Sequence, residues 1–344
     1  MTKKKKKKEV VMTNFYDKLL LFHLIHEFTY GNVSKKILSE TRGVVPNIDN
    51  IVKTFVSNIG MQIYSAFNDE NYFSNVVTSE YTEKEIPLPK DCFFNQFYLK
   101  ISIEKNNKVT YHGGMYPIKS FIINKSGDGF VFRPYIVLHI EGESIQTVVN
   151  KLSIALSHEL THAYDYYMYF QKNGFPQSVD DIEKSGTKRF TDAMRGNHSI
   201  ERVVGSINYR LSQKEMNAFL GQLKIELNNQ ADKIQDAKSA FDAIKKTDSF
   251  YSTYMYLKNE IETLIYDVED VDMRKEIIKY TNSVAEKKFT NYDQVKKYYF
   301  NRWYKWSEKY LTKASKIAFD VFAENSDIGG EGDFTGSFSL KKNV

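Results

Sequence analysis

The sequence predicts an α+β protein in which a small, mostly antiparallel sheet packs on one long helix and a largely helical part follows. Three observations support this class. Apolar residues recur at helical spacing near the N-terminus, alternate with polar residues between positions 97 and 140, and return to helical spacing from about Glu143. The chain has 344 residues, of which 42% are hydrophobic, so it can bury a sizeable core.

The N-terminal segment is expected to contain a tail and two helices. Residues 1–12 include the six consecutive lysines Lys3–Lys8, and we expect them to form a disordered tail. Helical spacing then predicts one helix from about Asn14 to Tyr30 and a second from Asp49 to about Phe67. The net charge of +5 becomes −1 without the six lysines, so the basic charge belongs to the tail, and nucleic acid is not an expected partner.

The sheet is expected in the middle of the chain. Phe97–Ile103 alternates apolar and polar residues, and Asn106-Asn107 offers a turn after it. Val109–His112 is therefore predicted to return beside the first strand as a hairpin. The other predicted strands are the hairpin pair Phe121–Asn124 and Phe130–Arg133, and the last strand Tyr135–Ile140.

A six-residue stretch within the next helical pattern carries the chemistry. Residues 157–162 read Ser-His-Glu-Leu-Thr-His, inside a pattern that runs from about Glu143 to Phe170. Residues four apart lie on one face of a helix, so His158 and His162 can bind one metal ion. Glu159 lies beside this face and can take a proton from a water molecule whose pKa the ion lowers to ~7. The alternative is a core helix with two hydrogen-bonded histidines and a surface glutamate.

This stretch resembles the H-E-x-x-H motif of the zincin metallopeptidases, and more narrowly of their gluzincin type. The resemblance covers the helix around His158 and leaves out the first ninety and the last eighty residues. It implies a zincin-like fold, a Zn²⁺ cofactor held by His158 and His162, and Glu159 as the general base. It also implies a later glutamate as third ligand, and a strand whose exposed edge pairs with an extended peptide or protein substrate.

Two downstream glutamates are candidates for the third zinc ligand. Glu215 is followed three positions later by the small Ala218, which suits a helix that must approach the metal closely. The alternative for this residue is a capping box with Ser212, in which the Glu215 side chain faces solvent. Glu260, followed by Thr263, is the second candidate.

Other polar residues are candidates for supporting roles in such a site. Asp165 comes three residues after His162 and can accept a hydrogen bond from a ligand histidine. A peptidase also needs a donor that stabilises the developing oxyanion. Tyr209, Tyr164 and His198 are the candidates for this donor, and the sequence does not choose between them.

We expect four parts in the chain. These are the tail 1–12, an α+β subdomain 13–170 with the sheet and the H-E-x-x-H helix, a mainly helical subdomain 171–325 with the third ligand, and a flexible tail 326–344. The aromatic and lysine-rich pattern of Tyr292–Phe322 predicts an amphipathic helix in preference to a nucleic-acid surface.

The sequence also limits compartment and function. The single cysteine, Cys92, excludes an internal disulfide and a cysteine zinc site. Neither a signal peptide nor a membrane span is predicted, which favours the cytoplasm, including that of a host cell, or a virion. The residue bias is typical of AT-rich coding, as in a phage. A zinc metallopeptidase is the leading hypothesis. The alternatives are a non-catalytic zincin-like structural or virion-associated protein, and a nucleic-acid-binding protein that uses the lysine tail.

Overall fold

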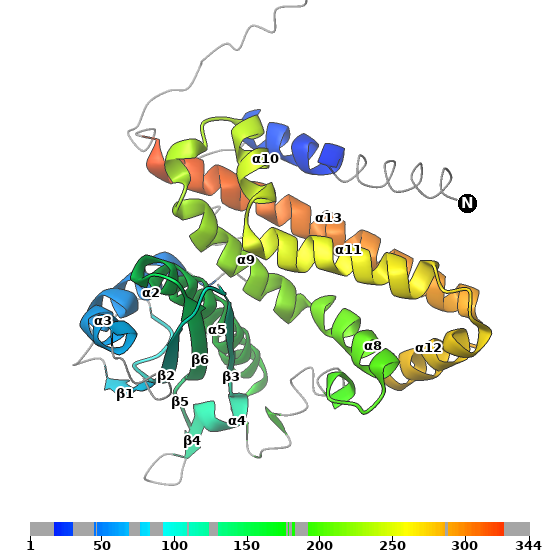
Figure 1. The fold of residues 1–344 in the computed structure, drawn as a ribbon, viewed down its shortest axis with the longest axis horizontal. Helices are drawn as coiled ribbons and strands as arrows, with labels where there is room; N and C mark the ends of the chain where they lie inside the picture. Colours follow the sequence, from blue (N-terminus) through cyan, green and yellow to red (C-terminus); the bar gives the residue numbers. More distant parts are fainter. Residues whose placement is uncertain are drawn as a thin grey trace, which may run out of the picture.

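The protein is α+β, with mostly helices and a small mixed sheet (Figure 1). The structure is a computed structural model. It describes residues 17–29, 45, 47–68, 76–82, 92–108, 110–123, 130–176, 178, 181–182, 192–285 and 288–326. The expected tail 1–12 and all but the first residue of the expected tail 326–344 lie outside these ranges. Within them, no helix is long and apolar enough to cross a membrane.

Within the ranges that the structure describes, the main sheet has four strands. In spatial order they are β1 (Val76–Thr82), β2 (Gln96–Lys105), β6 (Tyr135–Gly142) and β3 (Tyr111–Met115). β6 runs parallel to β2, whereas β1 and β3 run antiparallel to their neighbours. A separate small hairpin, β4 (Phe121–Ile123) and β5 (Phe130–Phe132), confirms the second predicted hairpin.

The first predicted hairpin is wrong, because the return strand does not pair with β2. β3 pairs with β6, which inserts between them. Period-two alternation identifies a strand but not its neighbour. β2 and β6 both alternate buried and half-buried residues along their length, which suits the centre of the sheet, whereas β3 carries Gly113 and Gly114 and lies at the edge.

Helices α2 (Ile48–Asn58), α3 (Gly60–Asn68) and α5 (Ile145–Asn173) share one apolar core with the inner face of the sheet. The single helix predicted from Asp49 to Phe67 is thus two helices that meet at Ile59. The long helix α5 begins with Ser144, whose hydroxyl accepts a hydrogen bond from Thr147 N at 3.2 Å. It ends at Gly174, whose φ of 88° favours glycine.

The C-terminal part is mostly helix, as predicted. The short helix α4 (Pro117–Ser120) belongs to the sheet region. From residue 199 on, the helical segments are α8 (Ser199–Arg210), α9 (Gln213–Asn228), η1 (Ala231–Lys233), α10 (Ala237–Lys245), α11 (Tyr256–Glu260), α12 (Val271–Val284), α13 (Tyr292–Asn325) and the π-helical turns η2 (Phe250–Met255) and η3 (Ile261–Tyr266). Trp303, Trp306 and Tyr310 of α13 are buried in its core. These aromatic rings therefore serve packing and are not available to stack on bases.

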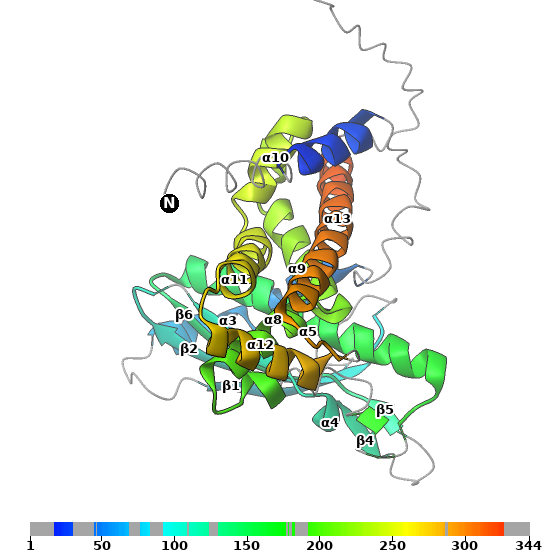
Figure 2. The same cartoon turned by 90° about the vertical axis from the view of Figure 1, so that its right-hand side faces the viewer.

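The N-terminal helix over residues 17–29 belongs to this second core. Leu20 and Leu24 pack with residues of the C-terminal helices. The ribbon of this helix lies beside α10 and α13 in both views (Figures 1 and 2). The expected subdomain 13–170 places this helix with the sheet, whereas its buried residues pack in the core of the C-terminal helices. The described residues therefore form two apolar cores. Residues 17–29 belong to one, α2, α3 and α5 with the sheet form the other, and from α8 on the chain packs mainly in the first again.

Candidate metal centre

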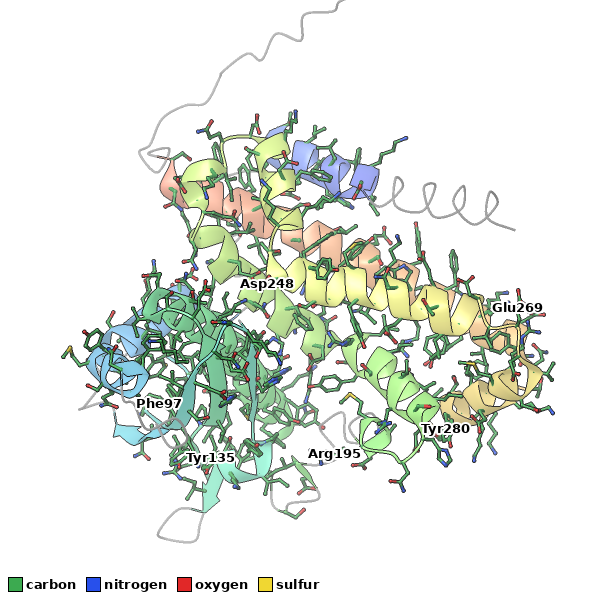
Figure 3. The ribbon with its side chains drawn as sticks, in the orientation of Figure 1. Phe97, Tyr135, Arg195, Asp248, Glu269 and Tyr280 are labelled. Atoms are coloured by element: carbon green, nitrogen blue, oxygen red, sulfur yellow. The ribbon has the colours of Figure 1, made fainter. Side chains whose placement is uncertain are left out.

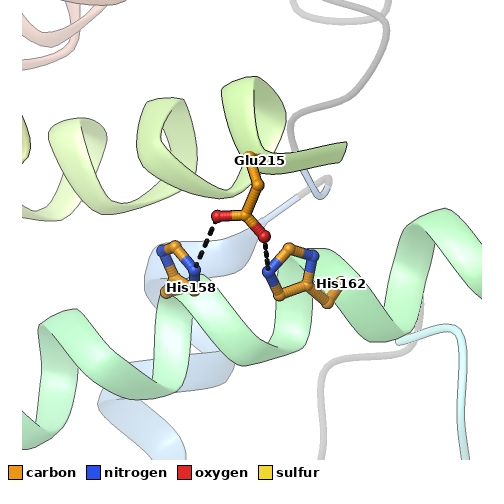
Figure 4. Close-up of side chains that lie close together, drawn as sticks. All are labelled: His158, His162 and Glu215. Carbon is orange, nitrogen blue, oxygen red and sulfur yellow. Dashed lines mark ion pairs between the residues drawn. The ribbon is translucent and has the colours of Figure 1, made fainter. Parts of the chain in front are cut away.

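Two helices from the two cores meet at the candidate metal centre. His158 and His162 lie one turn apart on α5, and Glu215 lies in the first turn of α9 (Figure 4). Nε2 of His162 is 3.1 Å from Oε1 of Glu215, and Nε2 of His158 is 3.8 Å from Oε2. One nitrogen or oxygen from each of the three residues lies within 4.8 Å of the others, so the set can hold one metal ion.

Small residues allow α9 to approach α5 this closely. A Cβ added to Gly221 would lie 2.5 Å from Oγ1 of Thr161, and Ala218 is fully buried. The Thr161 hydroxyl turns back to donate to the Ser157 carbonyl oxygen at 2.8 Å. The close crossing brings the start of α9, and with it Glu215, over the histidine face of α5.

Only half of the alternative capping box forms at Glu215. The backbone N–H of Glu215 donates to Oγ of Ser212 at 3.3 Å. The Glu215 side chain does not face solvent, since the residue is 3% exposed and its carboxylate points at the histidines. The same residue therefore helps to begin the helix with its backbone and offers a ligand with its side chain.

The three ligand candidates form a charged unit. Burial opposes protonation of His162, but contact with the Glu215 carboxylate outweighs it and raises the pKa of His162 to about 9. Burial likewise opposes ionisation of Glu215, and the charge and hydrogen bond of His162 lower its pKa to about 2. Burial, followed by the charge of His162, lowers the pKa of His158 to about 4. At neutral pH the unit thus carries one proton on His162 and a negative charge on Glu215.

Glu159 links α5 to β3 at the edge of the sheet. Its residue is 6% exposed, and its Oε2 accepts a hydrogen bond from the backbone N–H of Met115 in β3 at 2.7 Å. Burial raises the pKa of Glu159. The carboxylate is therefore a stronger base than that of an exposed glutamate, and it lies between α5 and the edge strand β3.

A cleft of about 1050 Å³ opens over these residues. β3 and the chain up to Ile118 line one wall, and α8 and α9 line the other with Tyr209 and Phe219. Arg195 and Asp248 also line it, and Figure 3 labels both. β3 is last in the sheet order, so no other described strand pairs with its outer edge.

A chain of hydrogen-bonded polar groups runs from β3 through α9 beside His158. The Tyr111 hydroxyl donates to Oε1 of Gln222 at 3.0 Å, and Nε2 of Gln222 donates to Oε1 of Glu226 at 3.3 Å. Oε2 of Glu226 accepts from the N–H and the hydroxyl of Ser249, at 3.1 and 2.5 Å. Gln222 also raises the pKa of His158 through hydrogen bonding, although Nδ1 of His158 has no well-aligned partner.

Sequence reasoning missed this chain of contacts. Its signal was the spacing on α9, because Gln222 and Glu226 follow Glu215 by seven and eleven residues and so share its helix face. The chain connects the edge strand, α9 and the segment before η2. It therefore fixes the two walls of the cleft, and the segment before η2, relative to one another.

Two of the residues expected in supporting roles, Tyr209 and Asp165, lie close to the three ligand candidates. Tyr209 lines the cleft and hydrogen-bonds Glu215, and burial raises its pKa. Asp165 accepts a hydrogen bond from Nδ2 of Asn217 at 3.2 Å, and its charge raises the pKa of His162. Burial raises the pKa of Asp165 itself to about 6.

Three other candidates lie away from the centre. The Tyr164 ring packs against Phe93 with centroids 5.1 Å apart, and the His198 ring lies 5.8 Å from that of Tyr280. Glu260 ends α11 and lies outside both the metal cluster and the lining of the cleft. The structure therefore brings Glu215 and Tyr209 to the histidines, and it does not bring Glu260, His198 or Tyr164.

Comparison of the chain with family models, with curated proteins and with solved structures finds no match.

Proposed function

We propose that the protein is a zinc-dependent metallopeptidase of the gluzincin type, with a zincin-like arrangement of edge strand and metal helix. One observation carries this proposal. His158 and His162 converge on Glu215, while the neighbouring carboxylate of Glu159 accepts a hydrogen bond from the edge strand β3 of the same cleft. The class thus rests on the geometry of the ligands, the base and the strand together.

The residues fit zinc. Two imidazoles and a carboxylate are a ligand set of catalytic zinc sites, and a tetrahedral ion with bonds of ~2.0–2.2 Å holds its ligand atoms roughly 3.3 Å apart. Nε2 of His162 lies 3.1 Å from Oε1 of Glu215 and Nε2 of His158 lies 3.8 Å from Oε2, which are distances on either side of this spacing. When bound, the ion supplies a Lewis acid for the peptide carbonyl and lowers the pKa of a water to ~7.

Glu159 moves the proton. Met115 N–H holds Oε2, which leaves Oε1 to accept a proton from the attacking water. The carboxylic acid then gives this proton to the leaving amine nitrogen, and Glu159 returns to its ionised form. The raised pKa of the buried carboxylate favours the first transfer.

The walls of the cleft bind and orient the substrate. The outer edge of β3, apart from the Met115 N–H that Glu159 occupies, offers backbone donors and acceptors to an extended peptide, which needs no particular side chain. The Tyr209 hydroxyl lies beside Glu215 on the opposite wall. It is the donor that we assign to the developing oxyanion.

Zinc content and hydrolysis of a peptide library, measured together, test this function. Glu159→Gln is expected to keep its zinc and to lose about 10²–10⁴-fold in kcat. His162→Ala is expected to lose the zinc of this site and the hydrolysis with it, while the matched control His198→Ala keeps both. Hydrolysis by Glu159→Gln at the wild-type rate would overturn the proposal. Zinc binding at this site without turnover of any peptide would favour the non-catalytic alternative.

A further inference from the structure

The outer face of the sheet carries a second group of metal-ligand side chains. Nε2 of His139 on β6 lies 3.5 Å from Oε2 of Glu104 on β2 and 3.5 Å from Oε1 of Glu141 on β6. The three ligand atoms lie within 4.8 Å of one another, as do those of His158, His162 and Glu215. This spacing again matches ligand atoms around one ion.

Strand register places two like charges face to face in this group. Glu104 and Glu141 are direct partners on neighbouring parallel strands. Carboxylates in this relation repel each other. Alternation along β6 buries Leu138 and Ile140 and turns His139 and Glu141 to the other face, away from α5. Both carboxylates therefore lie on one partly exposed surface, where a bound cation would offset their repulsion.

The ring of His139 is held in position for a ligand. Ser102, its direct partner on β2, has its hydroxyl oxygen 2.8 Å from Nδ1. This bond turns Nε2 toward the two carboxylates, as partners behind metal-bound histidines do. Nδ2 of Asn106 donates to Oε2 of Glu141 at 3.5 Å, which leaves Oε1 toward His139.

A second imidazole lies across the next strand pair. His112 on β3 is the direct partner of His139, and the two rings are parallel within 9° with centroids 6.5 Å apart. His112 is exposed, so a rotamer change can bring a further nitrogen to an ion held by His139. Such a bond would tie the edge strand β3, which lines the cleft, to the centre of the sheet.

We propose that His139, Glu104 and Glu141 form a second metal site, for a divalent first-row transition metal such as zinc, with His112 as an additional ligand. Imidazole with carboxylate suits these metals better than Mg²⁺ or Ca²⁺. The side chains of His139 and Glu104 are 36% and 40% exposed, so the site binds more weakly than the buried centre. This inference does not depend on the peptidase proposal, because the ligands of the second site are not among the three ligands of the buried centre.

Zinc titration of the metal-free full-length chain against a chromophoric chelator tests the site. Wild type is expected to bind two equivalents, and His139→Ala and His158→Ala one each. The double variant is expected to bind none. The matched histidine control His198→Ala keeps two equivalents. The double substitution Glu104→Gln with Glu141→Gln preserves side-chain shape and should raise the Kd of the more weakly bound zinc ion at least tenfold. His112→Ala should raise this Kd by a smaller factor.

Circular dichroism and melting of each variant separate loss of a ligand from loss of the fold. Two outcomes overturn the inference. In the first, folded His139→Ala binds as many equivalents as wild type. In the second, wild type binds a single equivalent that His158→Ala removes. If His158→Ala loses only the more tightly bound zinc ion and keeps the more weakly bound one, that result supports this site even where the peptidase proposal fails.

Discussion

Gly221 of α9 lies against Thr161 of α5, and an added Cβ would come within 2.5 Å of the threonine hydroxyl oxygen. The candidate metal centre depends on this contact, because Glu215 reaches the histidines only if the two helices cross closely. The hydroxyl is buried and bonded to the Ser157 carbonyl oxygen, so it has little room to give way.

Gly221→Ala is therefore expected to lower the free energy of unfolding by about 1–3 kcal/mol and to weaken zinc binding. Chemical denaturation and chelator competition measure the two effects. Thr161→Ala in the same chain removes the clash and should recover part of both. Gly60→Ala is the matched control, since nothing lies within 4 Å of its added Cβ. Unchanged stability and zinc affinity in Gly221→Ala would contradict the close crossing.

Zinc binding at the buried centre is expected to release one proton. The pKa of His162 is about 9 and that of His158 about 4, so only His162 is protonated between these values. Zinc must displace that proton, and its affinity should rise about tenfold per pH unit from pH 5 to 8 and level off above 9. Calorimetry of His139→Ala in buffers of different ionisation enthalpy counts the protons at this centre alone. An affinity independent of pH would show that His162 is neutral before zinc binds.

The buried carboxylate of Glu226 is expected to support the metal centre from a distance. In Glu226→Gln the new amide cannot accept every bond that Ser249 and Gln222 donate. The free energy of unfolding should fall by about 1–3 kcal/mol, and zinc affinity by roughly 10- to 100-fold. Denaturation and chelator competition give both values. A stability loss without any change in zinc affinity would separate Glu226 from His158.

Tyr209 and Tyr164 form a matched pair for the oxyanion donor. Tyr209→Phe is expected to lower kcat on the order of 10²-fold with little change in KM, because the hydroxyl acts on charge that develops in the transition state. Tyr164→Phe should keep wild-type kinetics, since its ring packs on Phe93 and does not line the cleft. Steady-state kinetics of both variants decide the assignment, and equal rates in the two would remove Tyr209 from this role.

Local patterns predicted much of the fold and the centre. The spacing of His158 and His162 needs only one helix, and the small Ala218 after Glu215 already pointed to a close helix contact. Alternation located β2, β6 and the β4–β5 hairpin, because the two faces of a strand meet different surroundings.

Long-range relationships were beyond these patterns. No local signal shows that β6 inserts between β2 and β3, or that Leu20 and Leu24 pack with the C-terminal helices. Gln222 and Glu226 resemble ordinary helix residues until Tyr111 and Ser249 arrive from other parts of the chain. These contacts depend on which elements become neighbours, and that is decided by packing of the whole chain.

Anomalous diffraction at the zinc edge, from crystals of the zinc-loaded protein, tests the central claim most directly. The account predicts a peak about 2.0–2.2 Å from Nε2 of His158, Nε2 of His162 and a carboxylate oxygen of Glu215. Glu215→Gln should lose that peak, and Glu260→Gln should keep it. A zinc-loaded crystal with no peak between these three side chains, or with one held by Glu260, would contradict it.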